Sequence, residues 1–181
     1  PPLSPPPPGA FIDKAALQSA LDEYHASVTS AEAVYGPIGS WDVSRITDMS
    51  SLFSIKRNFN GNVSGWDTSK VTSMYRTFYY ASSFNQAVDS WDVSKVTTMS
   101  NTFSYATNFN QAVDSWDVSK VKTMSWTFRS ATNFDQPLRW ADVSKVTTFT
   151  SMLDGTSSLS DCNKFLIHSV MSSNPAWPYS W

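Results

Sequence analysis

Hydrophobic and polar positions recur along this chain with a fixed spacing of 25 residues. Five units align without insertions on an aspartate, which is followed by serine at the second position, a basic residue at the third and valine or isoleucine at the fourth. The aligned aspartates are Asp42, Asp67, Asp92, Asp117 and Asp142. A period of about 20 to 50 residues is typical of stacked repeats, because one short unit cannot bury its own apolar side.

Each unit contains a β-branched segment, such as KVTTM in the third, which predicts a strand. The segment that follows it, SNTFSYATNF, predicts a return arm with a short helix or 3₁₀ turn. Strands of successive units would pair in parallel about 4.8 Å apart. The sequence therefore predicts an α/β repeat solenoid of five 25-residue, leucine-rich-repeat-like coils with a parallel β-sheet, although valine, methionine, phenylalanine and tryptophan replace leucine.

The two ends of the chain differ from the repeat. Residues 11–27 have apolar side chains at helical spacing, and Ser160 or Asp161 is a candidate N-cap for a second helix. Six prolines among the first eight residues predict a polyproline tether. The expected organisation is a tether at 1–10, an N-terminal helical cap at 11–36, a five-coil solenoid at 37–159, and a C-terminal cap with an aromatic tail at 160–181.

Composition narrows the possible partners. The chain has 181 residues and a net charge of −2, which gives no general attraction to nucleic acid or to anionic membranes. No apolar run approaches the roughly 20 residues that a membrane-spanning helix needs. The opening PPLSPPPP is unlike a native start, so we expect that a leader was removed. Cys162 is the only cysteine, which excludes an intrachain disulfide.

Several segments together resemble a known family. YGPIGSWDVSRITDMSSLF, FNQAVDSWDVSKVTTM and CNKFLI look like the BspA-like leucine-rich-repeat surface proteins, whose repeat also occurs in mycoplasma lipoproteins and in secreted or surface proteins of bacteria, algae and other protists. The resemblance spans about residues 11 to 170. It implies a solenoid at the cell surface or outside the cell, and members of the family are associated with adhesion to matrix proteins and to other cells.

Two polar columns carry candidate chemistry. The stacked aspartates could hold calcium, or each could accept backbone N–H groups in an Asp-x-Ser turn, with the basic residue offsetting the charge. The sequence has no glycine-rich calcium loop, which favours the turn, also for Asp89 and Asp114. We therefore predict no metal and no cofactor. The second column predicts side-chain hydrogen bonds along the stack, and its members are Asn60, Asn85, Asn110 and then Asp135.

Aromatic and threonine columns have two interpretations each. The regular spacing of the tryptophans favours core packing over an exposed sugar- or protein-binding strip, and they are Trp41, Trp66, Trp91 and Trp116. Two threonine-rich columns could order water as in ice. Lys122 and Asp48 interrupt them, and adjacent strand positions face opposite sides, so ice binding is a distant alternative.

Residues that depart from the repeat template are the candidates for ligand or partner contact, because variation on a constant frame is where specificity would lie. They are Tyr79, Tyr80, Tyr105, Trp126, Arg76 and Arg129. Asn62 begins an Asn-Val-Ser glycosylation sequon.

No catalytic motif is visible in the sequence. His25 and His168 are far apart in sequence, and no histidine or aspartate near Cys162 is arranged to activate it. We therefore expect a non-catalytic, extracellular or cell-surface module that displays a rigid repeat face to a protein or a glycan. The alternative is a structural subunit of a larger protein assembly.

Overall fold

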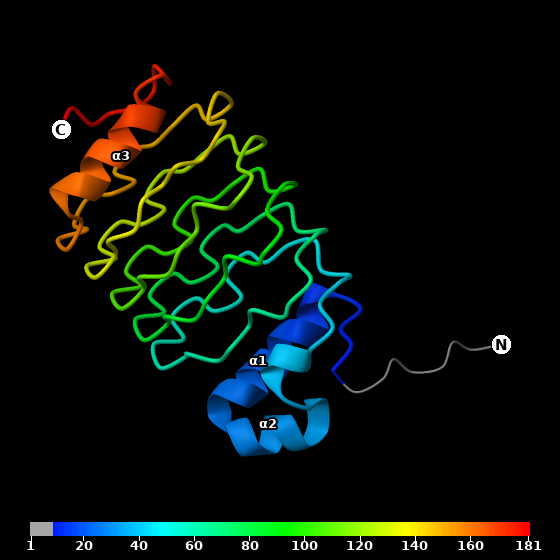
Figure 1. The fold of residues 1–181 in the computed structure, drawn as a ribbon. Helices are drawn as coiled ribbons and strands as arrows, with labels where there is room; N and C mark the ends of the chain where they lie inside the picture. The colour runs from blue at the N-terminus through cyan, green and yellow to red at the C-terminus, as the bar shows by residue number, and fades with distance from the viewer. Residues whose placement is uncertain (1–8) are drawn as a thin grey trace.

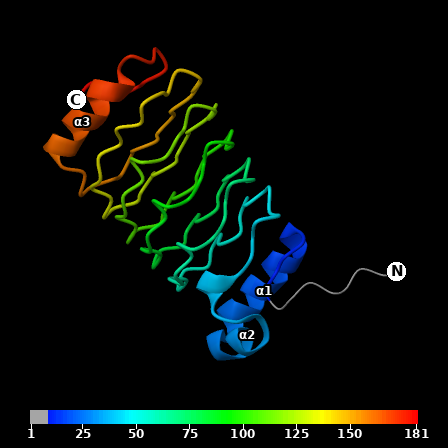
Figure 2. The ribbon, with the colours of Figure 1, turned by 45° about the vertical axis from the view of Figure 1, so that its right-hand side comes forward.

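Residues 9–181, which the computed structural model describes, form a stack of coils with helices at both ends (Figure 1). Helices α1 (Lys14–Ala26) and α2 (Val28–Tyr35) lie at one end and are followed by the 3₁₀ helix η1 (Ile38–Ser40). Helix α3 (Asp161–Met171) lies at the other end (Figure 2). Most of the predicted tether at 1–10 lies outside the described residues, which begin at Gly9.

The helices begin and end at residues suited to capping. The Asp13 carboxylate accepts from the N–H of Ala16 at the start of α1, which buries Leu17, Ala20 and Leu21. The apolar spacing does not predict α2, which ends at Gly36 with φ 77°, a value that favours glycine. In α3, Ser160 is the N-cap, and Ile167 and Met171 are buried. Apolar faces therefore close both ends of the stack.

The predicted parallel β-sheet is wrong. Residues 9–181 contain no strand, and the KVTTM-type segments contribute one isolated parallel bridge between successive coils. These bridges join Asp48 to Ser73, Ser73 to Thr98, Thr98 to Thr123 and Thr123 to Thr148. The α/β solenoid of leucine-rich-repeat-like coils with a sheet is therefore not the fold of this chain. A further bridge joins Ala10 to Asp42 and ties the start of the described chain to the first coil.

The reason lies in the arm that follows each bridge. Two residues of every arm have a positive φ; in the third coil, counted by the aspartates, they are Asn101 and Tyr105, both at 60°. The arm is a run of tight turns, in which the N–H of Ser104 donates to the carbonyl of Asn101 and that of Ala106 to Phe103. Strands need an extended backbone with negative φ, so these arms cannot pair as strands.

Successive arms are nevertheless hydrogen-bonded to each other. Alternate N–H groups donate to the carbonyls of the next coil: Asn101 to Ser125 at 3.0 Å and Tyr105 to Arg129 at 2.8 Å. The same pattern repeats in the first, second and fourth coils. These bonds all run from one coil to the one after it, whereas near the end of each later arm an N–H group donates to the preceding coil, as Asn108 does to Ser82. The N–H groups of the arm that face the next coil, such as those of Asn101 and Tyr105, are therefore already bonded.

The two ends of this ladder are closed by different chemistry. At the first coil, where arm carbonyls face no earlier coil, the Gln18 side-chain amide donates to the carbonyl of Leu52. At the last coil, where arm N–H groups face no later coil, the N–H of Leu153 donates to the Tyr179 hydroxyl at 2.8 Å. That hydroxyl in turn donates to the Asp154 carboxylate. Helix α1 thus supplies a donor, and the C-terminal tail supplies an acceptor.

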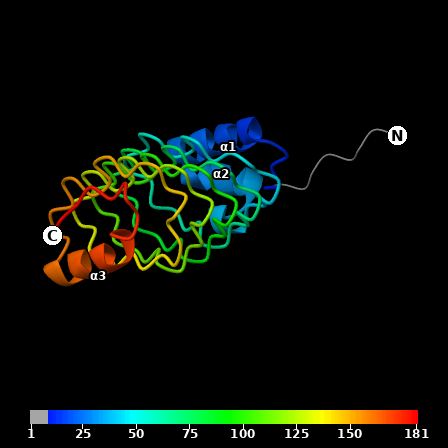
Figure 3. The same cartoon turned by 90° about the horizontal axis from the view of Figure 1, so that it is seen from above.

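Figure 3 shows the stack of coils from above. Its core consists of columns in which equivalent side chains stack from coil to coil. The rings of Phe53, Phe78, Phe103 and Phe128 are fully buried, with successive centroids 4.9, 5.4 and 5.5 Å apart. A second phenylalanine column starts at Phe59 and packs against the first. Because burying one phenylalanine contributes roughly 1.5–3 kcal/mol, these columns provide much of the driving force for stacking.

Candidate ligand-binding site

A hollow of about 420 Å³ opens on the arms of the second, third and fourth coils. It exists because the third coil has small side chains where its neighbours have large ones. Asn101 occupies the column between Arg76 and Trp126, and Ser104 occupies the column between Tyr79 and Arg129. We call this feature the aromatic hollow; its floor consists of Ser100, Asn101 and Ser104, and its walls of Tyr75, Arg76 and Tyr79 on one side and Trp126 and Arg129 on the other.

Three tyrosines form one end of the aromatic hollow. The rings of Tyr80 and Tyr105 are parallel within 7°, with centroids 4.3 Å apart. Tyr79 meets both rings edge-on, at 4.6 and 6.3 Å. Burial, and then the neighbouring phenols, raise the pKa of Tyr80, so its hydroxyl remains a neutral donor near pH 7. The cluster is therefore a packed aromatic surface.

Guanidinium groups lie against these rings. The Arg76 guanidinium carbon is 5.0 Å from the ring centroids of both Tyr75 and Tyr79, and that of Arg129 is 6.0 Å from Tyr105. Such contacts are attractive cation–π pairs. Within residues 9–181 neither arginine belongs to an ion pair; the pairs there involve Lys14, Lys56, Arg139 and Lys164. Both walls thus carry positive charge that no carboxylate contacts.

The floor has polar groups without partners. Ser104 is 1% exposed, and its hydroxyl has no hydrogen bond within the described part of the chain. Buried polar groups are almost always hydrogen-bonded, so this hydroxyl is an exception that calls for an explanation. The Asn101 side chain is also buried, and no described residue bonds to it, whereas Ser100 is bonded to Thr123 at 2.9 Å. The floor can offer both donors and acceptors to a bound group.

The structure thus brings all six predicted contact residues to one place. Arg76, Tyr79, Tyr80, Tyr105, Trp126 and Arg129 all line the aromatic hollow. Sequence reasoning did not identify Tyr75 or the floor. Tyr75 departs from a column that otherwise holds serine or threonine, so it could have been found by the same criterion. The small floor residues resemble ordinary repeat positions and carry no such signal.

The tryptophan column is elsewhere and is buried. Trp41, Trp66, Trp91 and Trp116 are 2–3% exposed. The indole nitrogens of the last three donate to backbone carbonyls 28 residues earlier, at 2.9–3.0 Å. That of Trp41 donates to Gly36. These rings have no exposed face to offer to a sugar or a protein.

The aspartate column forms turns. In all five coils the carboxylate accepts from the N–H of the serine two residues later, at 2.8–3.0 Å. The hydroxyl and N–H of Ser44 hold the pKa of Asp42 below its usual range, and Ser69, Ser119 and Ser144 have the same effect on their aspartates. Between residues 9 and 181, no cluster of three or more histidine, cysteine or acidic groups could hold a metal ion. The acids serve local backbone structure.

The asparagine column forms a ladder along the stack. The side-chain oxygen of Asn60 accepts from the N–H of Asn85 and from the side-chain amide of Gln86. Asn85 and Asn110 repeat this arrangement one and two coils later. Asp135 ends the ladder by accepting from Ser160, the N-cap of α3. The column therefore connects the coils to the C-terminal helix.

The exposed threonine column and the Asn62 sequon lie outside the aromatic hollow. In the exposed threonine column, the hydroxyls of Thr72, Thr97 and Thr147 donate to backbone carbonyls 25 residues earlier, and Lys122 interrupts the series. This arrangement gives no support to ice binding. Asn62 is exposed, and its side-chain oxygen accepts from the Ser64 hydroxyl at 2.8 Å.

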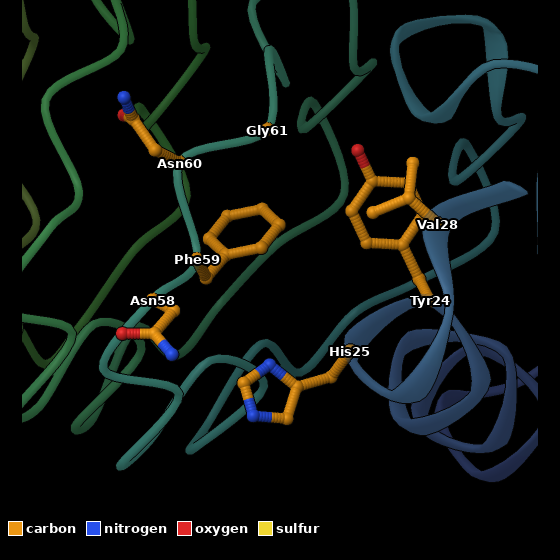
Figure 4. A pocket seen from close by; sticks show the side chains of 7 residues that line it. All are labelled: Tyr24, His25, Val28, Asn58, Phe59, Asn60 and Gly61. Atoms are coloured by element: carbon orange, nitrogen blue, oxygen red, sulfur yellow. The ribbon is translucent and has the colours of Figure 1, made fainter.

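A second hollow, of about 400 Å³, lies where the end of α1 meets the first coils (Figure 4). Tyr24 and Phe59 face each other across it, with His25 and Asn58 at its rim. The oxygen of Asn60, which also lines it, is already bonded in the asparagine ladder. This hollow contains no buried polar atom without a partner among the described residues. The aromatic hollow is therefore the stronger candidate for binding.

The fold and the hollow define a repeat protein of stacked 25-residue coils with one cleft built from departures from the repeat. The family model described as "Mycoplasma protein of unknown function, DUF285" matches residues 20–111 and again 84–177, and this chain belongs to that family. No curated protein and no solved structure matches the chain. Across residues 9–181, no helix has the length and apolar character needed to cross a membrane.

Proposed function

We propose that this protein is a non-catalytic binding module that acts at the cell surface or outside the cell and presents the aromatic hollow to a protein or a glycan. The observation that carries the proposal is that the predicted contact residues lie together in one hollow. Six residues that depart from the repeat line a single hollow, whose floor has a buried hydroxyl without a partner among the described residues. Aromatic and arginine side chains are also the residues that most often dominate binding energy at interfaces.

The location belongs to the same proposal. It is supported by the resemblance of the repeat to BspA-like surface proteins. The exposed Asn62 sequon is consistent with secretion. The absence of catalysis is also part of the proposal. His25 lies on α1 and His168 on α3, at opposite ends of the stack (Figure 1).

The test is to apply the purified protein to arrays of immobilised glycans and extracellular proteins and to measure its binding. We expect reproducible binding that falls at least tenfold when Tyr80 and Tyr105 are both replaced by asparagine. Asparagine suits their positive φ values, so the backbone should not change. The control is Phe165→Ala, which removes an exposed aromatic ring from α3, far from the hollow. Undiminished binding by the double variant would show that the hollow is not the contact site.

The alternative function is that of a structural subunit in a larger assembly. Large exposed apolar side chains on the end helices favour it: Phe165 on α3 is 70% exposed and Val34 on α2 is 56% exposed. Native mass spectrometry of source material would support this alternative if it showed a complex of fixed stoichiometry. In that case Phe165→Ala, and not the tyrosine double variant, should release the subunit.

A further inference from the structure

We infer that the ligand of the aromatic hollow is an acidic carbohydrate, a sugar ring that bears a carboxylate or a sulfate group. This inference rests on the proposed function, since it names the ligand class of the same site. It follows from the shape of the hollow, the state of its backbone, the chemistry of its lining and the charge of its walls.

The shape is that of a slot one coil wide. The walls belong to the second and fourth coils, which are roughly 10 Å apart because adjacent parallel backbones stack about 4.8 Å from each other. Between them the third coil places the short side chains of Ser100, Asn101 and Ser104, and its Tyr105 lies at the end formed by the tyrosines. A volume of about 420 Å³ falls in the range of pockets that bury small ligands. A single ring, or a short chain of rings, can lie between the walls.

The backbone of the slot argues against an extended peptide. Peptides that bind by strand addition use free N–H and C=O groups at the edge of a sheet. Here the N–H groups of Asn101 and Tyr105 donate to the fourth coil, and the carbonyls of Ser100 and Ser104 accept from the second. Recognition must therefore come from side chains.

Those side chains suit a hydroxylated ring. The lining contains tyrosine, tryptophan, arginine, serine, threonine and asparagine, and includes no aliphatic residue that could anchor an apolar peptide side chain. Trp126 is 37% exposed, so part of its indole is open to solvent. An aromatic face can cover the apolar side of a sugar ring. The hydroxyl of Ser104 and the amide of Asn101 can then bond to the ring hydroxyls.

The positive charge of the walls indicates that the bound sugar is acidic. The Arg76 and Arg129 guanidinium groups belong to opposite walls, and the lining contains no aspartate or glutamate. Asp154, which follows Arg129 in its column, accepts instead from the Tyr179 hydroxyl. Planar guanidinium groups bind carboxylates and similar oxyanions through two parallel hydrogen bonds. Contacts with Tyr75 and Tyr79 hold Arg76 against its wall.

The experiment is calorimetric titration of the full chain with four probes of similar length. These are oligogalacturonate, which carries carboxylates; sulfated dextran; unmodified dextran; and oligoglutamate. We expect one of the two acidic sugars to bind at least tenfold more tightly than dextran and than oligoglutamate. The affinity should fall with added salt, because the arginines are partly solvated. Comparing oligogalacturonate with sulfated dextran identifies which acidic group is preferred.

Variants link that binding to the slot. Ser104→Tyr fills the floor with the side chain that the same column already has at Tyr79, so the coil should accept it while binding falls at least tenfold. Arg76→Asn removes one cation and places at a positive φ the residue type found there at Asn101; it should also weaken binding at least tenfold. Phe165→Ala serves as the control and should bind normally.

The outcomes separate this inference from the proposed function. Equal binding of dextran would overturn the acidic requirement. Preferential binding of oligoglutamate would identify an acidic peptide as the ligand class instead. If no probe binds, but the tyrosine double variant loses binding to a ligand found on the arrays, the proposed binding function is supported and the assignment of an acidic sugar is wrong. If no ligand of any kind depends on the hollow, both proposals fail.

Discussion

The rings of Tyr80 and Tyr105 lie parallel with their centroids 4.3 Å apart, although the two residues are 25 positions apart in sequence. Both have a positive φ, 56° and 60°, at a site where every coil has this conformation. The repeated backbone therefore fixes the position of the side chain at this site, and the sequence of each coil decides whether that side chain is aromatic. The same site holds Ile55, Ser130 and Gly155 in the other coils.

Ile55→Asn should stabilise the protein. Ile55 has φ 64°, which is unfavourable for a β-branched residue, and its side chain is 61% exposed, so little burial is lost. We expect the free energy of unfolding to rise by about 1 kcal/mol, measured by urea denaturation. Val34→Asn is the matched control, since Val34 is a similarly exposed residue in helix α2, where valine and asparagine have comparable propensities. An equal gain in both variants would contradict the explanation by strain.

Trp116→Phe should destabilise the core. The Trp116 indole nitrogen donates to the buried carbonyl of Val88 at 3.0 Å, and phenylalanine would remove that bond and leave a small void. A loss of about 1–3 kcal/mol is expected from thermal or urea unfolding. Trp126→Phe changes the same side chain at an exposed site and should alter stability by less than about 0.5 kcal/mol. Comparable losses in both would show that the buried hydrogen bond is unimportant.

Asp135→Asn should reduce the sensitivity of the protein to acid. The N–H of Ser160, and then the amide of Asn163, hold the pKa of Asp135 below its usual range. A depressed pKa gives stability that is present above the unfolded-state pKa, near 4, and is lost as the pH falls through the folded-state value. Asparagine occupies the same column at Asn110 and keeps the accepting oxygen.

The measurement is the urea midpoint of wild type and variant between pH 7 and pH 2. At pH 7 the variant should be less stable than wild type, because asparagine lacks the charge-assisted bonds, and it should lose less stability as the pH falls. Asp22→Asn is the control. The Lys56 ammonium lowers the pKa of Asp22, but its carboxylate is exposed and does not bind the end of the ladder. Identical pH profiles for wild type and the Asp135 variant would rule out a role for this carboxylate in acid unfolding.

Tyr179→Phe should loosen the last coil. The Tyr179 hydroxyl accepts from the N–H of Leu153, and phenylalanine would leave that N–H without its acceptor. We expect a loss of about 1 kcal/mol and faster hydrogen exchange at Leu153. Exchange in the second coil, at Phe78 for example, should change much less. Uniformly faster exchange would indicate a global effect instead.

The repeat period and its apolar columns could be read from the sequence, because stacking forces equivalent side chains such as Phe78 and Phe103 into contact. The sheet was a wrong prediction for a physical reason. Left-handed backbone is usually signalled by glycine or asparagine, but most residues at these sites are others, such as Arg76, Tyr80 and Trp126. The fold imposes that conformation through the next coil's hydrogen bonds, which no local pattern reveals.

The candidate site was predictable in part for a related reason. Large residues that break a repeat are visible, which is how the walls were found. The floor depends on residues that are notable only for being smaller than their neighbours one coil away, as Ser104 is between Tyr79 and Arg129. A hollow is a difference between adjacent coils, so it appears only when the coils are compared column by column in three dimensions.

The ladder of the arms has a consequence for how long such a protein can be. Each of the first four coils donates four N–H groups to carbonyls of the coil that follows it, at equivalent positions every time. The backbone contact between neighbouring coils is therefore the same at each step. Only the terminal groups, the Gln18 amide and the Tyr179 hydroxyl, are specific to their positions. A 25-residue unit can therefore be gained or lost as a cassette by recombination between near-identical copies. Each such event would widen, move or erase a slot without altering either end.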